Sequence, residues 1–253
     1  MTMAKVDLNS DMGEGFGPWA MGDDAALLKV VTSANVACGL HAGDPDVMAR
    51  TMRVAVENGV GIGAHPGFPD LQGFGRRRMD IPQGTLANMV RYQVGAAAAM
   101  AASVGGRLRH LKLHGALANM AAEDEAMARV CYEAALGAQP DLVVMVLAAT
   151  AQDRAAKSIG CAVAHEIFAD RAYEDDARLV DRKHPGAVIH DPARAAERMV
   201  AMVKAGAIIA ENGKHIPTRI DTICLHGDTA EAVEIARSVR AGLEASGVTV
   251  VPL

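Results

Sequence analysis

Aromatic residues and cysteines are scarce in this chain of 253 residues. Phe, Trp and Tyr together make up 3% of the sequence against 51% for all hydrophobic residues, so the core must be mainly aliphatic. The four cysteines lie far apart and include no CxxC pair; they are Cys38, Cys131, Cys161 and Cys224. Such scattered cysteines argue against a disulfide scaffold and are typical of reduced, buried thiols in a cytosolic protein.

Long hydrophobic runs and blocks of one charge are also missing. The longest apolar run, around residues 142–149, is far shorter than the roughly 20 residues of a membrane-spanning helix. No signal-peptide core precedes the first predicted strand. Lys and Arg total 25 against 30 for Asp and Glu, and a net charge of −5 without a basic block argues against nucleic acid or an anionic membrane as a partner. We therefore expect a soluble cytoplasmic protein.

Short apolar segments alternate with helical patterns along the whole chain. Seven segments have the composition of buried strands, namely residues 5–9, 32–37, 59–64, 110–112, 141–147, 161–166 and 221–225, and a short one follows at 248–251. Helical patterns lie at residues 44–58, 82–103, 121–136, 191–204 and 229–246. Repeated strand–helix units predict a parallel sheet. At this length we expect one α/β domain, residues 1–253, built on a closed parallel barrel of seven strands.

Local signals support this organisation. An Asp-Pro pair opens the helices predicted at 44–58 and 191–204, where Asp caps the first turn and Pro fits into it. Asn212 and Gly213 predict a small hairpin insertion within residues 207–218. The turn after the first strand lacks the GxGxxG pattern, which argues against an open dinucleotide-binding sheet.

Polar side chains gather where the predicted strands end. In chain order they are Asp7, Asn9, Asp11, Glu14, His41, His65, Lys112, His114, Glu166, Asp170, Arg171, His226 and Asp228. In a parallel barrel such positions lie on the C-terminal rim, where barrel enzymes keep their active sites. Polar groups that converge on one cavity indicate a binding or catalytic pocket, and we predict one here.

Several polar residues also have simpler interpretations. Asp11 fits a turn, Asp44 fits a helix cap, and Asp228 fits a helix cap or a substrate contact equally well. The three arginines at 76–78 fit either a solvated loop or an anion-binding loop. The histidines at positions 110, 165, 184, 190 and 215 are interpreted as structural or surface residues.

Seven motifs, in order along nearly the whole chain, resemble the LamB/YcsF family. They are DLNSDMGEGFG, SANVACGLHAGDP, GAHPGFPDLQGFGRR, KLHGALAN, FADRAYEDDARLV, PGAVIHDP and DTICLHGD. The resemblance implies a distorted seven-stranded β/α barrel similar to the glycoside hydrolase and deacetylase group. It also implies cleavage of 5-oxo-L-proline to L-glutamate coupled to hydrolysis of ATP to ADP and phosphate, with Mg²⁺ accompanying ATP. The partners implied are subunits B and C of 5-oxoprolinase.

The chain departs from the family pattern at three positions. Leu113 stands where the family usually has proline, and Ala118 where it has tyrosine. Loss of the tyrosine would enlarge the pocket or remove a hydroxyl contact, so the substrate could differ from 5-oxoproline. Ser10 stands where many members have cysteine, which argues against an essential thiol nucleophile there.

Opening a lactam with ATP requires a base, an acid and cations beside the phosphoryl oxygens. We assign the base to Asp11 or Glu14, and we expect His41 and His65 to orient water or substrate. Lys112 would stabilise developing negative charge, and His114 and His226 would act as acids or hydrogen-bond donors. The residues expected to bind substrate are Asp7, Asn9, Glu166, Asp170, Arg171, His226 and Asp228.

Two other functions compete with this one. Asp11, His41 and His65 are a sound ligand set for a metal-dependent amide or polysaccharide deacetylase-type hydrolase, although the HxxxH spacing of a helical metal site is missing. Alternatively the chain is a non-catalytic, substrate-binding subunit, because no P-loop is present and ATP would then be handled at a shared interface or on a partner. Metal analysis and ATP titration distinguish these functions.

Overall fold

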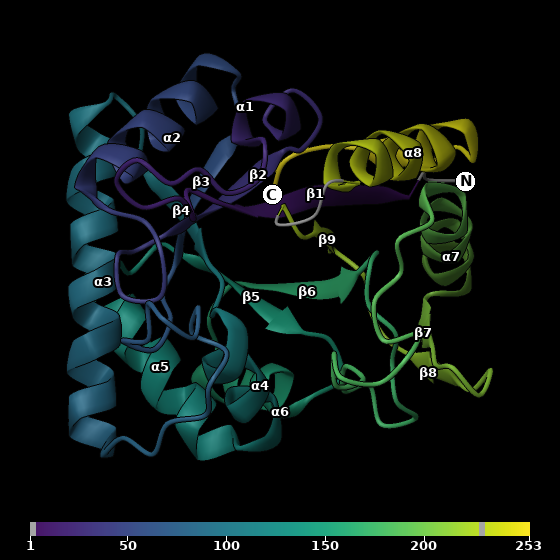
Figure 1. The fold of residues 1–253 in the computed structure, drawn as a ribbon. Helices are drawn as coiled ribbons and strands as arrows, with labels where there is room; N and C mark the ends of the chain where they lie inside the picture. Colours follow the sequence, from purple (N-terminus) through teal and green to yellow (C-terminus); the bar gives the residue numbers. More distant parts are fainter. Residues whose placement is uncertain (1–3, 228–230) are drawn as a thin grey trace.

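The structure, a computed structural model, describes residues 4–227 and 231–253, and its centre is a closed barrel (Figure 1). The barrel strands are β1 (Lys5–Met12), β2 (Ser33–Ala37), β3 (Gly61–His65), β4 (Leu108–Leu111), β5 (Val143–Leu147), β6 (Val163–Phe168) and β9 (Thr222–Leu225). All neighbours are parallel, and the ring closes because β1 pairs with β2 on one side and with β9 on the other. The predicted seven-stranded parallel barrel is confirmed.

The ring is irregular at two places. The short strand β10 (Thr249–Val250) pairs with Lys5 and Val6 at the start of β1, before β9 joins β1 at Asp7. The register between β3 and β4 shifts between Ile62 and Gly63. A β-bulge of this kind bends a strand and increases its twist, so the barrel departs from ideal geometry here.

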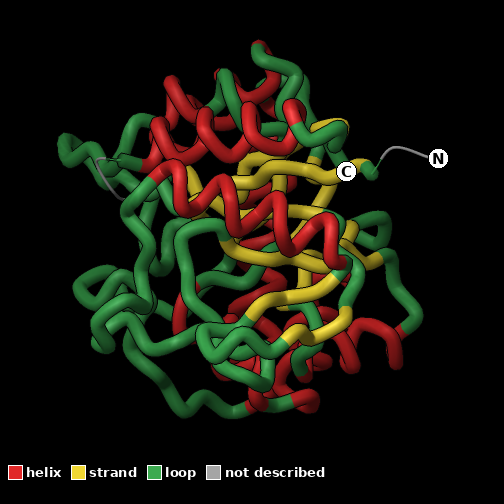
Figure 2. Tube along the Cα trace, turned by 90° about the vertical axis from the view of Figure 1, so that its right-hand side faces the viewer, coloured by secondary structure: helices red, strands yellow, loops and turns green. Residues whose placement is uncertain are grey.

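Helices surround the barrel on its outside (Figure 2). They are α1 (Asp24–Leu27), α2 (Pro45–Glu57), α3 (Gln83–Ser103), α4 (Gly115–Glu123), α5 (Glu125–Ala138), α6 (Ala151–Ile159), α7 (Pro192–Ala205) and α8 (Ala232–Ala245). The Asp-Pro starts are as predicted, because Asp44 and Asp191 each accept hydrogen bonds from two backbone N–H groups of the following turn. Within the described part of the chain, no helix has both the length and the apolar character needed to cross a membrane.

The helix predicted at 121–136 is wrong at its start. Asp124 has extended backbone angles and accepts hydrogen bonds from the N–H groups of Ala126 and Met127, so it ends α4 and caps α5. An Asp side chain competes with helical hydrogen bonding in this way, which the alanine-rich pattern concealed. The short helices α1, α4 and α6 were not predicted, and residues 228–230, with the predicted start of the last helix, lie outside the described residues.

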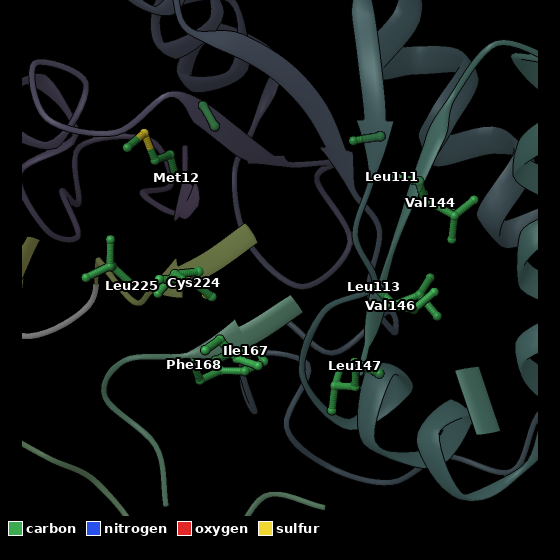
Figure 3. Close-up of a cluster of buried hydrophobic side chains, with 14 of the residues drawn as sticks. Met12, Leu111, Leu113, Val144, Val146, Leu147, Ile167, Phe168, Cys224 and Leu225 are labelled. Carbon is green, nitrogen blue, oxygen red and sulfur yellow. The ribbon is translucent and has the colours of Figure 1, made fainter. Parts of the chain in front are cut away.

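The apolar core lies between the strands and the helices. Figure 3 shows part of the buried apolar clusters, including Val144, Val146 and Ile167 from neighbouring strands. Ala97 and Ala101 of α3 are fully buried, and such small side chains let a helix lie close to its neighbours. Each fully buried aliphatic side chain contributes roughly 1.5–3 kcal/mol, so this aliphatic layer holds the barrel closed without many aromatics.

The inside of the barrel, by contrast, is polar. β1 extends to Met12 and not to residue 9, so Asp7, Asn9 and Asp11 are alternate residues of one strand and share the inward face. The rim position predicted for Asp7 and Asn9 is therefore wrong. They lie deeper in the barrel. Because alternate residues of a strand point to the same face, Asn9 lies one layer and Asp7 two layers below Asp11.

A small antiparallel pair lies beside the barrel between α7 and β9. β7 (Ala207–Ile209) pairs with β8 (His215–Pro217), and the connection contains Gly213 with a positive φ of 81°. This pair occupies the segment for which Asn212 and Gly213 predicted a hairpin.

His165 on β6 forms a buried charge cluster on the outer side of the barrel. Its Nδ1 lies 2.8 Å from Asp221 Oδ2 and its Nε2 lies 3.0 Å from Asp153 Oδ1. The hydrogen bond to Asp221 is the main cause that raises the pKa of His165, and the charge of Asp153 adds to it. A raised pKa stabilises the fold fully below the ordinary histidine pKa, and this contribution is lost as the pH rises through the folded-state pKa.

We expect His165→Gln to destabilise the protein more at pH 6 than at pH 9. At pH 6 the variant loses hydrogen bonds to charged groups, worth about 1.5–3 kcal/mol, and this loss becomes smaller as the rising pH removes the proton from the wild-type imidazole. Urea unfolding at both pH values measures the difference. An equal loss at the two pH values would contradict the assigned charge state.

Candidate active site

The lowest polar layer of the barrel is centred on Asp7. Its Oδ1 accepts hydrogen bonds from the hydroxyls of Thr32 (2.6 Å) and Ser33 (2.8 Å), and its Oδ2 accepts one from Thr222 (2.6 Å). Burial raises the pKa of Asp7, and the three hydroxyls oppose that effect. Asp7 is 1% exposed and does not line the cavity described below, so it joins strands at the base of the barrel.

The middle layer connects the bottom of the barrel to the site through the side-chain amides of Asn9 and Asn35. Asn9 Nδ2 donates to Glu166 Oε1 at 2.9 Å, and Asn35 Nδ2 donates to Asn9 Oδ1 (2.7 Å) and Asp11 Oδ1 (2.9 Å). His110 Nε2 donates to Asn35 Oδ1 at 2.8 Å, in agreement with a structural role for this histidine. Asn35 was missed at the sequence level, and the one available signal was a polar residue in the middle of an apolar strand.

Above this layer, Lys112 lies between two carboxylates. Its Nζ is 2.8 Å from Asp11 Oδ1 and 3.1 Å from Glu166 Oε1, and the residue is only 4% exposed. Burial alone would lower the pKa of Lys112, but Asp11, Cys224 and Glu166 hold it well above its ordinary value. The site therefore contains a permanent, immobilised positive charge.

The two carboxylates beside Lys112 differ in their proton affinity. Burial alone would raise the pKa of Asp11, but the charges of His65 and Lys112 outweigh burial and keep it well below its ordinary value. For Glu166 burial dominates and raises the pKa, although Lys112 opposes it. Asp11 is thus ionised across the neutral range, and Glu166 holds a proton more readily.

Three histidines and Glu14 lie next to Asp11. His65 is the last residue of β3, His41 follows β2, and His114 caps the start of α4. The rings of His41 and His114 stack with centroids 3.6 Å apart, and His65 meets both edge-on. Burial is the main cause that lowers the pKa of His41 and of His114, so both rings are neutral at neutral pH.

These four residues could hold a metal ion. One ligand atom from each of Glu14, His41, His65 and His114 lies within 4.8 Å of the others. Asp11 belongs to a second such group, with Cys224 and His226. The predicted trio of Asp11, His41 and His65 is therefore divided between two groups in the described part of the chain.

Two glycines allow the histidines to pack so closely. Gly75 has a φ of 61°, and a Cβ there would lie 2.7 Å from His41 Cβ and 2.8 Å from His114 Cδ2. A Cβ on Gly67 would lie 2.6 Å from His41 Nδ1. Glycine adopts this left-handed backbone at Gly75 with less strain than residues that carry a Cβ. The ion pair between Arg77 and Asp70 joins two parts of the same loop.

A second histidine–carboxylate pair lies across the site. His226 Nδ1 is 2.7 Å from Asp170 Oδ2, and the His226 ring stacks on Phe168. Burial alone would raise the pKa of Asp170, but the charge and hydrogen bond of His226 outweigh it and lower the pKa. Asp170 is behind His226 and does not line the cavity. Asp228, predicted beside them, lies outside the described residues.

The site opens into a cavity of about 1010 Å³. Asp11, Glu14, His65, Lys112 and His114 line its buried end, whereas His41, Asn9 and Glu166 do not line it. Leu113 and Ala118 also line it, so the residues at both positions contribute directly to the shape of the pocket.

The outer part of the cavity carries charges of both signs. Its lining includes the cations Arg76, Arg171, Arg182 and Lys183 and the acids Glu174, Asp175, Asp176 and Asp181. Arg171 donates to the backbone carbonyls of Val180 and Ala187 and so secures the loop that forms this wall; burial lowers its pKa to about 10, and nearby Arg182 adds to the effect. Of the three arginines at 76–78, Arg77 pairs with Asp70 and Arg78 with Glu123, whereas Arg76 lies over the Phe74 ring.

The chain is similar over nearly its whole length to proteins already known. The model of the LamB/YcsF family matches residues 6–253. The A subunit of the 5-oxoprolinase from Ruegeria pomeroyi is 66% identical over 248 residues, which is 98% of each chain. A lactam utilization protein from Thermus thermophilus superposes with a TM-score of 0.92 at 42% identity, covering 98% of this chain and all of that one. A family 4 carbohydrate esterase from Streptomyces lividans shares the fold, with a TM-score of 0.51 at 11% identity over 98% of this chain and 91% of that one.

Proposed function

The chain belongs to the LamB/YcsF family, and we propose that it is the A subunit of an ATP-dependent 5-oxoprolinase. The reaction would convert 5-oxo-L-proline and water to L-glutamate, coupled to hydrolysis of ATP to ADP and phosphate. Similarity to the A subunit of another 5-oxoprolinase over 98% of the chain supports this reaction. The observation that carries it in the structure is the buried end of the cavity, where an ionised carboxylate, an immobilised ammonium group and neutral imidazoles meet.

The chemistry assigns different tasks to these groups. ATP would transfer its γ-phosphoryl group to the lactam oxygen and leave as ADP, which makes the ring carbon electrophilic. Water would add to that carbon, the ring C–N bond would break to leave an acyl phosphate, and a second water would release phosphate and glutamate. Lys112 stabilises the negative charge that develops on oxygen, because its charge is immobilised in a site of low polarity. Asp11 is ionised and orients the attacking water, but its low pKa makes it a weak base, so Glu14 is the second candidate for accepting the proton.

The leaving nitrogen needs a proton when the ring C–N bond breaks. His226 lines the cavity, and Asp170 holds its Nδ1 at 2.7 Å, which leaves Nε2 for the substrate. A carboxylate behind an imidazole fixes its orientation and stabilises its protonated form. We therefore assign the acid to His226 and not to His114, with Asp170 as the positioning residue of His226.

The nucleotide would occupy the outer part of the cavity. Arg76, Arg182 and Lys183 line that part and are cations suited to phosphoryl oxygens, with Mg²⁺ accompanying ATP. A volume of about 1010 Å³ exceeds what a single small lactam fills, since drug-sized ligands occupy roughly 300–1,000 Å³. Subunits B and C would complete the complex in the cytoplasm.

Glutamate release from 5-oxoproline tests this proposal. We would assay this chain alone and then with subunits B and C, each with and without ATP. The proposal predicts glutamate only when ATP and all three subunits are present. Glutamate without ATP, lost on chelation, would favour a metal-dependent hydrolase. No glutamate from a folded, associated complex would show that the substrate is a different one, and the cavity wall at Ala118 would be the place to vary.

A further inference from the structure

Two backbone carbonyls determine which ring nitrogen of His65 and of His114 carries a proton. His65 Nδ1 lies 2.8 Å from the carbonyl oxygen of Lys112, and His114 Nε2 lies 2.8 Å from that of Phe74. A carbonyl oxygen only accepts hydrogen bonds, so each of these nitrogens must carry the proton. In the neutral rings, His65 Nε2 and His114 Nδ1 are then left as lone pairs.

These two lone pairs face each other. His114 Nδ1 is 3.0 Å from His65 Nε2, a hydrogen-bond distance at which either a proton or a metal ion must lie between the two nitrogens. Two carboxylate oxygens approach the same space: Asp11 Oδ2 lies 3.3 Å from His65 Nε2, and Glu14 Oε1 lies 3.6 Å from His114 Nδ1. A metal ion bound between these acceptors, or a proton shared by the two rings, would stabilise such an arrangement.

The donor set suits a transition metal ion. Glu14 Oε1 also lies 3.4 Å from His41 Nε2, so three imidazoles and one carboxylate point at one space. Zinc bonds of about 2.0–2.2 Å to nitrogen and oxygen place tetrahedral ligands roughly 3.3 Å apart, close to the 3.0–3.6 Å between neighbouring atoms here. Imidazole and carboxylate ligands select a divalent first-row metal, and no thiolate belongs to the group.

We propose that Glu14, His41, His65 and His114 bind a divalent transition metal ion, with Zn²⁺ as the ion that this set fits. His41 is 1% exposed and closes the site from behind, while the other three ligands line the cavity. The carbonyls of Lys112 and Phe74 orient His65 and His114, as the outer partners of metal-binding histidines commonly do. The ion would lie beside Asp11 at the buried end of the cavity, within reach of substrate or water.

Metal titration of the purified full-length chain tests the site without any activity assay. After treatment with chelator, ZnCl₂ would be titrated by calorimetry, and CoCl₂ by visible absorption as a probe of ligand geometry. We expect one equivalent of Zn²⁺ bound, and Co²⁺ absorption bands of a four-coordinate nitrogen and oxygen site. His114→Gln and Glu14→Gln should each weaken Zn²⁺ binding by at least about 10–100-fold, the loss seen even for outer partners of metal ligands.

Two matched variants complete the design. His165→Gln removes a buried histidine from the outer side of the barrel and should leave Zn²⁺ binding unchanged. His226→Gln removes a member of the second group, with Asp11 and Cys224, and should also leave it unchanged. Loss of binding in His226→Gln but not in His114→Gln would overturn the assignment. The proposal would also be overturned if a chain that is folded by circular dichroism binds no Zn²⁺. The 3.0 Å contact between His65 and His114 would then be a hydrogen bond through a shared proton.

Discussion

Replacing Lys112 with methionine is expected to lower the free energy of unfolding by about 3–5 kcal/mol, the usual cost of removing one partner from a buried ion pair. Lys112 is 4% exposed and contacts both Asp11 (2.8 Å) and Glu166 (3.1 Å). Methionine matches its length and apolar stem but leaves two carboxylates facing each other without a cation. Urea unfolding at pH 7 measures the loss.

The cost of this substitution should shrink as the pH falls. Lys112 is one of the charges that depress the pKa of Asp11, so its contribution is present above the ordinary Asp pKa and is lost as the pH falls toward the folded-state value. Without Lys112 the two carboxylates take up protons more easily. Arg109→Met, at an exposed position of β4 three residues before Lys112, is the control and should change stability by less than about 0.5 kcal/mol. Equal stability of Lys112→Met and wild type would disprove the buried ion pair.

The second large effect concerns activity. Asp11→Asn is expected to reduce glutamate formation by the reconstituted complex by about 10²–10⁴-fold, the range associated with general acid–base groups. Asparagine keeps the shape of the side chain and its contact with Asn35 but loses the negative charge beside Lys112 and His65. We expect the barrel to remain folded, because Lys112 keeps Glu166 as a partner.

Asp191→Asn provides the matched control for that experiment. Asp191 caps α7 by accepting from the N–H groups of Ala193 and Arg194, and asparagine caps helices about as well as aspartate. The same chemical change at this exposed site should therefore leave both activity and stability near wild type. Turnover and circular dichroism would be measured for both variants side by side. Near-full activity of folded Asp11→Asn would remove Asp11 from the catalytic groups.

The polar residues of the site were largely visible in the sequence, but their depth was not. Asp11, Glu14, His65, Lys112 and His114 all line one cavity. Asp7 and Asn9, although adjacent in the same motif, lie in lower layers of the barrel. The reason is that β1 continues to Met12, and the length of a strand depends on pairing with neighbours on both sides, which lie far away in the chain.

The closed barrel, by comparison, follows from the chain itself. Seven apolar segments separated by helical patterns dictate a parallel sheet, and the Asp-Pro helix starts are local chemistry that needs no distant partner. The break at Asp124 was hidden only because both sides of it are strongly helical. What the sequence by itself determined was thus the architecture and the edge of the sheet at which the polar groups gather.

Only the tertiary structure decided how those groups interact. The stacking of His41 on His114 depends on the close approach of Gly67 and Gly75, and the facing lone pairs depend on carbonyls of Phe74 and Lys112. These contacts join residues far apart in the chain, such as His41 and His114, and no local pattern encodes them. Hydrogen-bond direction and ring orientation are set by what surrounds a side chain in space, so the cation site emerges only after the barrel has closed.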